Sequence, residues 1–248
     1  MVTTVSDDNG TTHFFDVNGG KALAFKPKGL TDPEPRAVLV FLHGYNSTSD
    51  LKSYMASTPD TRDLRPLLAS RPLLLVEPWG GQSSDFSKFV TATGLTTLID
   101  EALKVAGMKS PPRAVILAAH SGGGMQLLPA VQSSFTYADR LTQVWALDCM
   151  YLGEGAKWIN WCRTNPGKTL RVRASTHPMS AKPRSQAEAI AKAADGGLLP
   201  NANVDIVDLA HDSFPPTFIP AFARFNADIG GRAAINEWQR PPLEQQRP

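Results

Sequence analysis

One stretch, residues 113–130, constrains the fold of this 248-residue chain more than any other. An apolar run over residues 114–119 is followed by His120, Ser121 and three glycines, and a helix-like apolar pattern comes next. This order predicts a strand, a tight turn and a helix, with the Ser121 hydroxyl held out at the edge of a sheet. Ala119 and Gly123, two positions before and after Ser121, are small enough for a strand to turn sharply into a helix.

Buried strands alternate with helical patterns through the rest of the chain. Strands are expected over residues 37–42, 72–77, 113–119, 143–147, 169–175 and 203–209, after an opening hairpin of residues 12–17 and 22–27. Helices are expected over residues 62–70, 85–107, 155–164, 185–194, 218–229 and 233–238, with a break near Gly94 and a polar loop over residues 47–59. Continuous apolar strands separated by helices predict an α/β fold, a mostly parallel central sheet with helices on both faces. Arg171 and Arg173 alternate with apolar residues, which places residues 169–175 near a sheet edge.

Composition excludes several classes of protein. The chain is 42% hydrophobic and 19% charged with a net charge of +2, which is typical of a soluble globule. The sequence has no cluster of Lys and Arg of the kind that predicts nucleic-acid binding. It has no apolar run long enough for a transmembrane segment. The N-terminal residues lack the features of a signal peptide, which favours the cytoplasm, with a secreted mature form as the alternative. The absence of repeats and long linkers predicts one domain over residues 1–248, with a frayed tail at 241–248.

The residues that could bind a metal or cofactor are sparse. Cys149 and Cys162 supply only half of a four-ligand zinc set. We expect them to be buried free thiols, with a disulfide as the alternative. The sequence has no Gly-rich phosphate loop with Lys and no close cluster of His and carboxylates, so it predicts no cofactor and no metal.

The turn around Ser121 resembles the nucleophile elbow of the α/β-hydrolase superfamily, usually written Gly-x-Ser-x-Gly. Here it reads Ala119-His120-Ser121-Gly122-Gly123, with Ala in place of the first Gly. The resemblance implies the α/β-hydrolase fold and Ser121 as a nucleophile, which needs a base within hydrogen-bond reach because a neutral hydroxyl attacks poorly.

The same resemblance implies the other two members of a Ser-His-Asp triad. In the superfamily the His follows the last strand, and His211 stands directly after residues 203–209. The commonest position for the acid, after the strand expected over residues 169–175, offers no carboxylate. Asp148, directly after the preceding strand, fits the known alternative position. Glu154 and Asp195 remain alternative acids, and Asp148 as a simple turn cap stays open.

An oxyanion hole needs backbone N–H groups aimed at the carbonyl oxygen as it gains charge. The resemblance implies Gly122 as one donor, and Tyr45 as the other because it follows a His-Gly turn like that of the superfamily. His43 in that turn is expected to bond backbone. Candidate substrate contacts are Tyr45, Trp79, His120 and Phe214.

The sequence therefore favours a serine hydrolase that cleaves a carboxylic ester through an acyl-enzyme. An amidase, a peptidase or an acyltransferase would use the same triad, and a non-catalytic binding protein of the same fold is the alternative from another class. The expected partner is a small-molecule or acyl-ester substrate. Whether the protein forms oligomers stays open.

Overall fold

The computed structural model describes residues 2–30, 37–46, 48–56 and 63–224. Within these residues the chain forms one nine-stranded sheet in the order β1-β2-β3-β5-β4-β6-β7-β8-β9. The strands are β1 (Val2–Ser6), β2 (Gly10–Val17), β3 (Gly20–Pro27), β4 (Ala37–Leu42), β5 (Leu73–Pro78), β6 (Ala114–His120), β7 (Leu141–Leu147), β8 (Thr169–Ser175) and β9 (Ala202–Val207). The six strands from β4 to β9 form a parallel sheet. On one side of it, β3 pairs antiparallel with β5, and β2 and β1 continue the antiparallel pairing to the edge.

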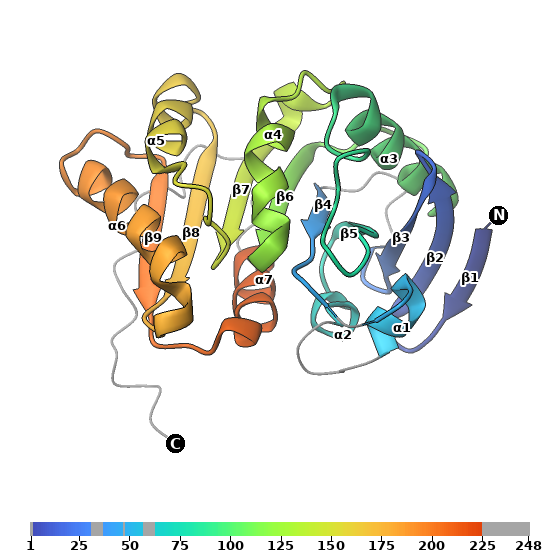
Figure 1. Ribbon diagram of the computed structural model, residues 1–248. Coiled ribbons are helices and arrows are strands. Elements are labelled where there is room, and N and C mark those ends of the chain that lie inside the picture. The colour runs from blue at the N-terminus through green and yellow to red at the C-terminus, as the bar shows by residue number, and fades with distance from the viewer. Residues whose placement is uncertain (1, 31–36, 47, 57–62, 225–248) are drawn as a thin grey trace.

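Helices cover both faces of this sheet (Figure 1). The α-helices are α1 (Leu51–Ala56), α2 (Arg65–Leu68), α3 (Ala92–Val105), α4 (Leu127–Gln132), α5 (Gly155–Thr164), α6 (Ala181–Asp195) and α7 (Phe214–Arg224). Short 3₁₀ helices are η1 (Ser121–Gln126), η2 (Ala138–Arg140), η3 (Pro178–Ser180) and η4 (His211–Ser213). Helices α3, α4, α5 and α6 contribute apolar side chains to one core, and α1, α2 and α7 contribute to the other. The α/β class and the mostly parallel sheet are as predicted.

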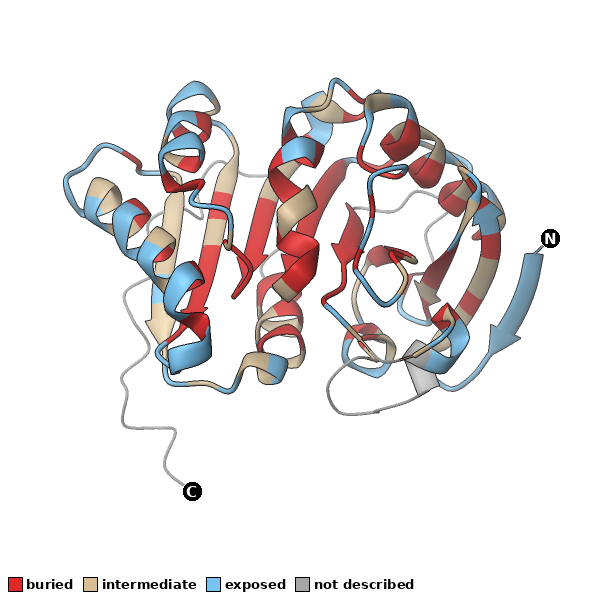
Figure 2. Cartoon of the chain, in the orientation of Figure 1, coloured by how far each residue is buried: buried red, intermediate tan, exposed pale blue. Residues whose placement is uncertain are grey.

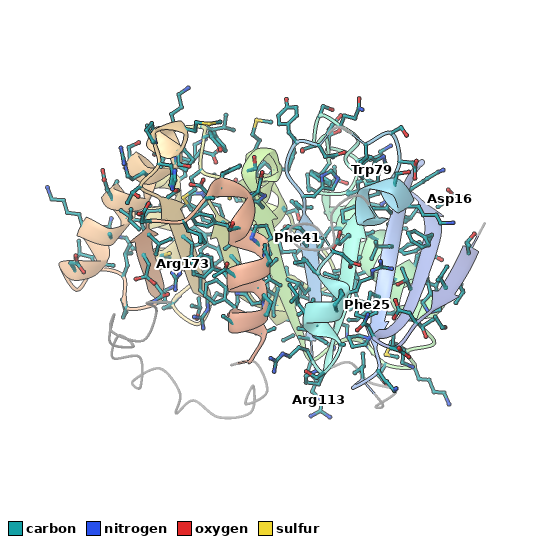
Figure 3. The ribbon with its side chains drawn as sticks, turned by 90° about the horizontal axis from the view of Figure 1, so that it is seen from below. Asp16, Phe25, Phe41, Trp79, Arg113 and Arg173 are labelled. Atoms are coloured by element: carbon teal, nitrogen blue, oxygen red, sulfur yellow. The ribbon has the colours of Figure 1, made fainter. Side chains whose placement is uncertain are left out.

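Burial follows the position of each strand in the sheet (Figure 2). Strands β4, β5 and β6 are buried along their whole length, because helices cover both of their faces. Phe25 and Phe41, labelled in Figure 3, are fully buried in the core beneath α1, α2 and α7. Strand β1, at the sheet edge, is exposed throughout. The rigid centre of the sheet is thus the part that carries the Ser121 turn.

Several elements differ from the sequence expectation. The helix expected over residues 85–107 begins at Ala92, where Thr91 caps it by accepting a hydrogen bond from Gly94 N–H at 3.0 Å. Gly94 therefore lies in the first turn of the helix and does not break it. Helix α1 forms within the stretch expected to be a polar loop, and β1 was not expected at all.

Strand β8 lies next to the edge strand β9, near a sheet edge as predicted. Arg173 on this strand is nevertheless only 4% exposed. Its guanidinium lies 4.9 Å from the Phe222 ring of α7 and forms an ion pair with Asp205 at 2.8 Å. An ion pair and an aromatic ring thus shield this cation.

Some expectations fall outside the described residues. These are the helix over residues 233–238, the end of the helix expected over residues 218–229, and the tail at 241–248. Helix α7 begins at Phe214, four residues before the expected start. No helix in the described ranges combines the length and apolarity that crossing a membrane requires.

Candidate active site

Ser121 occupies a strained turn at the carboxyl end of a central strand. Strand β6 ends at His120 and η1 begins at Ser121, whose φ is +51°. Residues with a side chain rarely adopt this left-handed conformation, and such strain clusters at functional sites. A Cβ on Gly123 would lie 2.3 Å from the Leu42 carbonyl oxygen, and one on Gly44 would lie 2.6 Å from Ser121 Cβ. Glycine is therefore required on both sides of the Ser121 turn.

Asp148 and His211 form a hydrogen-bonded pair. Asp148 directly follows β7, is fully buried and has a φ of +45°. His211 opens η4 after β9, and its Nδ1–H donates to Asp148 Oδ2 over 2.5 Å. Because Nδ1 carries the hydrogen, Nε2 of His211 is left as an acceptor for another proton.

Two serines also donate hydrogen bonds to the Asp148 carboxylate. Ser180 Oγ–H donates to Oδ2 over 2.5 Å, and Ser175 N–H donates to Oδ1 over 3.1 Å. Burial raises the pKa of Asp148, but the hydrogen bonds from His211, Ser180 and Ser175 outweigh it and leave the pKa below its ordinary value. The carboxylate is therefore ionised at neutral pH. Neither serine was singled out from the sequence.

His120 and Ser175 hold the turn that carries His211. The Nε2–H of His120 donates to the main-chain oxygen of His211 over 2.9 Å, and the two rings lie 4.5 Å apart between centroids. Ser175 Oγ–H donates to the Leu209 oxygen over 2.6 Å. The His211 ring thus lies against the residue that precedes Ser121. Within the described residues Ser121 and His211 make no direct hydrogen bond, which is common for catalytic pairs without a bound substrate.

The candidate oxyanion donors lie beside Ser121. Gly122 is the second residue of η1, so its N–H belongs to the first turn, where helical N–H groups lack a partner within the helix. Tyr45 Cδ2 would lie 3.0 Å from a Cβ on Gly122, so the Tyr45 ring lies beside Gly122. That the N–H groups of Gly122 and Tyr45 bind an oxyanion stays a prediction.

His43 holds the loop of Tyr45 in place, as expected for a residue that bonds backbone. It is fully buried; its Nδ1–H donates to the Gly44 oxygen over 2.7 Å, and its Nε2 accepts from Gly80 N–H over 3.2 Å. The loops after β4 and β5 are thereby tied together.

Tyr151 is a second residue that the sequence did not reveal. Burial raises the pKa of its phenol to about 12, the Asp148 carboxylate adds to this rise, and a hydrogen-bonding interaction with Ser121 opposes it. The phenol is therefore protonated at neutral pH beside the Ser121 hydroxyl. Tyr151 was not predicted because it belongs to no recognised motif, although it follows Asp148 by three residues.

The four candidate substrate contacts have different surroundings. Tyr45 is 66% exposed, and Trp79, labelled in Figure 3, is partly buried with its ring 4.9 Å from that of His43. His120 is buried against His211. Phe214 is fully buried at the start of α7, where its ring packs against that of Phe218. It is therefore a core residue, and we do not include it among the proposed substrate contacts.

The other candidates have partners or positions of their own. Glu154 precedes α5 and its carboxylate is 3.9 Å from Lys157 Nζ, and Asp195 is the last residue of α6. Cys149 and Cys162 are buried free thiols, as favoured from the sequence. Across the described part of the chain, no group of three or more His, Cys, Asp or Glu side chains could hold a metal ion.

Comparison with known proteins gives similarity in structure only. No family model matches the chain, and no curated protein matches it in sequence. An S-formylglutathione hydrolase from Agrobacterium tumefaciens superposes with a TM-score of 0.61 at 13% identity, covering 93% of this chain and 99% of that one. A ferulic acid esterase gives 0.61 at 14% identity over 91% and 96% of the two chains. LpqC, a poly(3-hydroxybutyrate) depolymerase from Bordetella parapertussis, gives 0.56 at 17% identity over 95% and 93%. The order of its strands and these superpositions show that the chain has the α/β-hydrolase fold.

Proposed function

We propose that this protein is a serine hydrolase that cleaves carboxylic esters through an acyl-enzyme, with Ser121, His211 and Asp148 as its triad. The observation that carries the proposal is the hydrogen bond from His211 Nδ1 to the buried Asp148 carboxylate, beside a strained turn with Ser121 at its apex. This bond fixes the tautomer in which Nε2 can accept a proton, as a general base must.

In the proposed mechanism Ser121 Oγ attacks the ester carbonyl while His211 Nε2 removes its proton. The carbonyl oxygen becomes an oxyanion, held by the N–H groups of Tyr45 and Gly122. His211 then gives the proton to the leaving alcohol, which produces the acyl-enzyme. Water attacks the acyl-enzyme with His211 again as the base, and Ser121 is released with the carboxylic acid.

An ester is the substrate class that we propose, with Tyr45, Trp79 and His120 lining the route to Ser121. The structural neighbours named above carry the names of a hydrolase, an esterase and a depolymerase, which supports hydrolysis. Within the same machinery, an amidase or acyltransferase would differ in the leaving group or in the nucleophile that reaches the acyl-enzyme.

The first test replaces the nucleophile and the base. Wild type should hydrolyse p-nitrophenyl acetate and be labelled by a fluorophosphonate probe, because the probe traps an activated serine. Ser121→Ala should lose both properties, and His211→Ala should lose hydrolysis, since either change removes a member of the triad. Rates, labelling and circular dichroism of the three proteins check this.

Two results would contradict the proposal. Wild type that is neither labelled nor active on any of a panel of esters would remove the catalytic assignment. Labelling that persists in Ser121→Ala would place the nucleophile elsewhere. A matched p-nitroanilide that is turned over as fast as the ester would favour the amidase instead.

A further inference from the structure

The Ser84 hydroxyl is a buried polar group whose hydrogen-bonding capacity is not satisfied within the described residues. Ser84 is 1% exposed, and its Oγ has no hydrogen-bond partner among the residues that the structure describes. Most buried hydroxyls are paired, because leaving one unpaired costs free energy. An unpaired one inside a well-packed loop therefore requires an explanation.

The position of Ser84 supplies one. A Cβ placed on Gly122 would lie 3.2 Å from Ser84 Oγ and 3.0 Å from Tyr45 Cδ2. The hydroxyl thus lies beside the two residues whose N–H groups we assign to the oxyanion.

The backbone of Ser84 is strained in the same way as that of Ser121 and Asp148. Its φ is +56°, and these three residues, with Asn18 in a hairpin turn, are the residues other than glycine with positive φ in the described ranges. Strain of this kind persists only where the surrounding structure enforces it, and it concentrates at functional sites. Three of the four such residues therefore lie at the candidate active site.

Hydrogen bonds between two loops enforce the position of Ser84. Gly80 N–H donates to His43 Nε2, and Asn46 Nδ2–H donates to the Gly81 oxygen over 3.2 Å. The loop after β5, which contains Ser84, is thus fixed to the loop after β4, which contains Tyr45. Donors that are held in place before the reaction need no rearrangement when charge develops.

We propose that the Ser84 hydroxyl is a third donor to the oxyanion, alongside the N–H groups of Tyr45 and Gly122. This inference rests on the proposed function. The Tyr45 ring and the Ser84 hydroxyl both lie beside Gly122, and the exposure of Tyr45 leaves its ring free to turn away when an acyl group enters. The hydroxyl finds its acceptor only when the carbonyl oxygen becomes negative, so it stabilises the transition state more than the bound ester. The proton stays on Ser84 throughout.

The experiment compares Ser84→Ala and Ser84→Gly with wild type on p-nitrophenyl acetate. Both variants remove the hydroxyl, but Gly accepts the positive φ and Ala does not. We expect kcat to fall in both variants on the order of 10²-fold with KM little changed, as for the loss of one oxyanion donor. A phenylalkyl trifluoromethyl ketone, which forms a tetrahedral oxyanion with the serine, should bind more weakly by a similar factor.

The controls separate the possible causes. Labelling of Ser121 by the fluorophosphonate and the thermal unfolding midpoint report whether each variant is folded with a reactive serine. If Ser84→Gly keeps the wild-type kcat while Ser84→Ala loses it, the residue serves backbone shape and the proposal fails. If wild type is active and both variants keep its kcat and ketone affinity, the role of Ser84 is wrong and the proposed function stands. An inactive, unlabelled wild type would overturn the proposed function and this inference together.

Discussion

Ser121 and Asp148 share a backbone conformation that few residues with a side chain adopt, and each follows directly after a buried strand. At the carboxyl end of a parallel strand the chain must leave the sheet, and a left-handed residue turns it most sharply. The side chains are consequently projected beyond the sheet edge, where ligands bind in open α/β sheets. Strain in single residues thus places both groups.

Asp148→Asn tests the charge at this position with little change in shape, because Asn also tolerates positive φ. We expect kcat to fall on the order of 10⁴-fold, since an amide can favour the wrong tautomer of His211. Steady-state kinetics with the p-nitrophenyl ester measure this.

Glu154→Gln is the matched control for the acid. Glu154 lies next to Lys157 and should be replaceable without loss of kcat. A nearly fully active Asp148→Asn together with an inactive Glu154→Gln would show that the acid was assigned to the wrong residue.

At the scale of elements, the ends of β6 and β8 hold the turn of His211, the proposed general base. Ser175 of β8 and His120 of β6 fix this turn, and both bonds end on main-chain oxygens. Strand β6 lies inside the sheet and β8 lies next to the edge strand β9. The proposed base is therefore positioned by two elements on which it does not lie.

Ser175→Ala should weaken this arrangement. The change leaves the Leu209 oxygen without its hydroxyl donor while the Ser175 N–H bond to Asp148 persists. We expect kcat to fall by up to about 10²-fold, because small displacements of a catalytic group are costly, with a loss of about 1–3 kcal/mol in the free energy of unfolding. Kinetics and urea unfolding measure the two effects.

Ser133→Ala provides the comparison, because its hydroxyl also donates to a main-chain oxygen, at 2.7 Å, but at the end of α4. It should lower stability and leave kcat unchanged. Equal losses of kcat in both variants would show that the tether of His211 has no special role.

The sequence predicted most elements because their patterns come from burial. The central strands and the hairpin of β2 and β3 formed as expected, since continuous apolar runs and an Asn-Gly turn are strong local signals. Strand β1 gives no such signal, because all five of its residues are exposed and pairing with β2 alone holds it. The shielding of Arg173 by Phe222 gives no local signal either, because the contact is tertiary.

The sequence points to candidate site residues only where a motif is contiguous or a residue lies at a strand end. Ser121, His211 and Asp148 meet these conditions, and their joint role stays a proposal. Ser180, Ser84 and Tyr151 do not, because each is an ordinary polar residue until the fold brings it near the proposed triad. No local pattern marks such residues.

At the scale of the whole molecule, Glu77 connects stability to pH. It lies on β5 opposite Leu23 of β3, and within the described ranges its two buried carboxyl oxygens have no hydrogen-bond partner. Burial raises its pKa well above the ordinary value, the nearby Asp63 adds to the rise, and Arg65 opposes it. The folded protein therefore retains this proton at a pH where the unfolded chain has released it.

This raised pKa makes wild type less stable as pH increases above the ordinary carboxyl value, until the folded pKa is passed. Glu77→Gln has no proton to release at this position. As pH rises through this range, the free energy of unfolding of the variant should therefore increase relative to that of wild type by about 1.4 kcal/mol per pH unit. Urea unfolding of both proteins between about pH 5 and 7 measures the difference.

Glu101→Gln is the control, since Glu101 is a partly exposed residue of α3 that pairs with Lys104. Its stability should run parallel to that of wild type over the same pH range. Parallel curves for Glu77→Gln as well would show that the buried carboxyl does not couple folding to protons.

Strand β9 is the last strand within the described residues and lies at one edge of the sheet, and His211 follows it. Ser121, Asp148 and the loop of Tyr45 all precede β9 in the sequence. Under the proposed mechanism, a chain cut before residue 211 keeps the hydroxyl and lacks the imidazole that would activate it. Turnover would accordingly report that the C-terminal side of the sheet is in place.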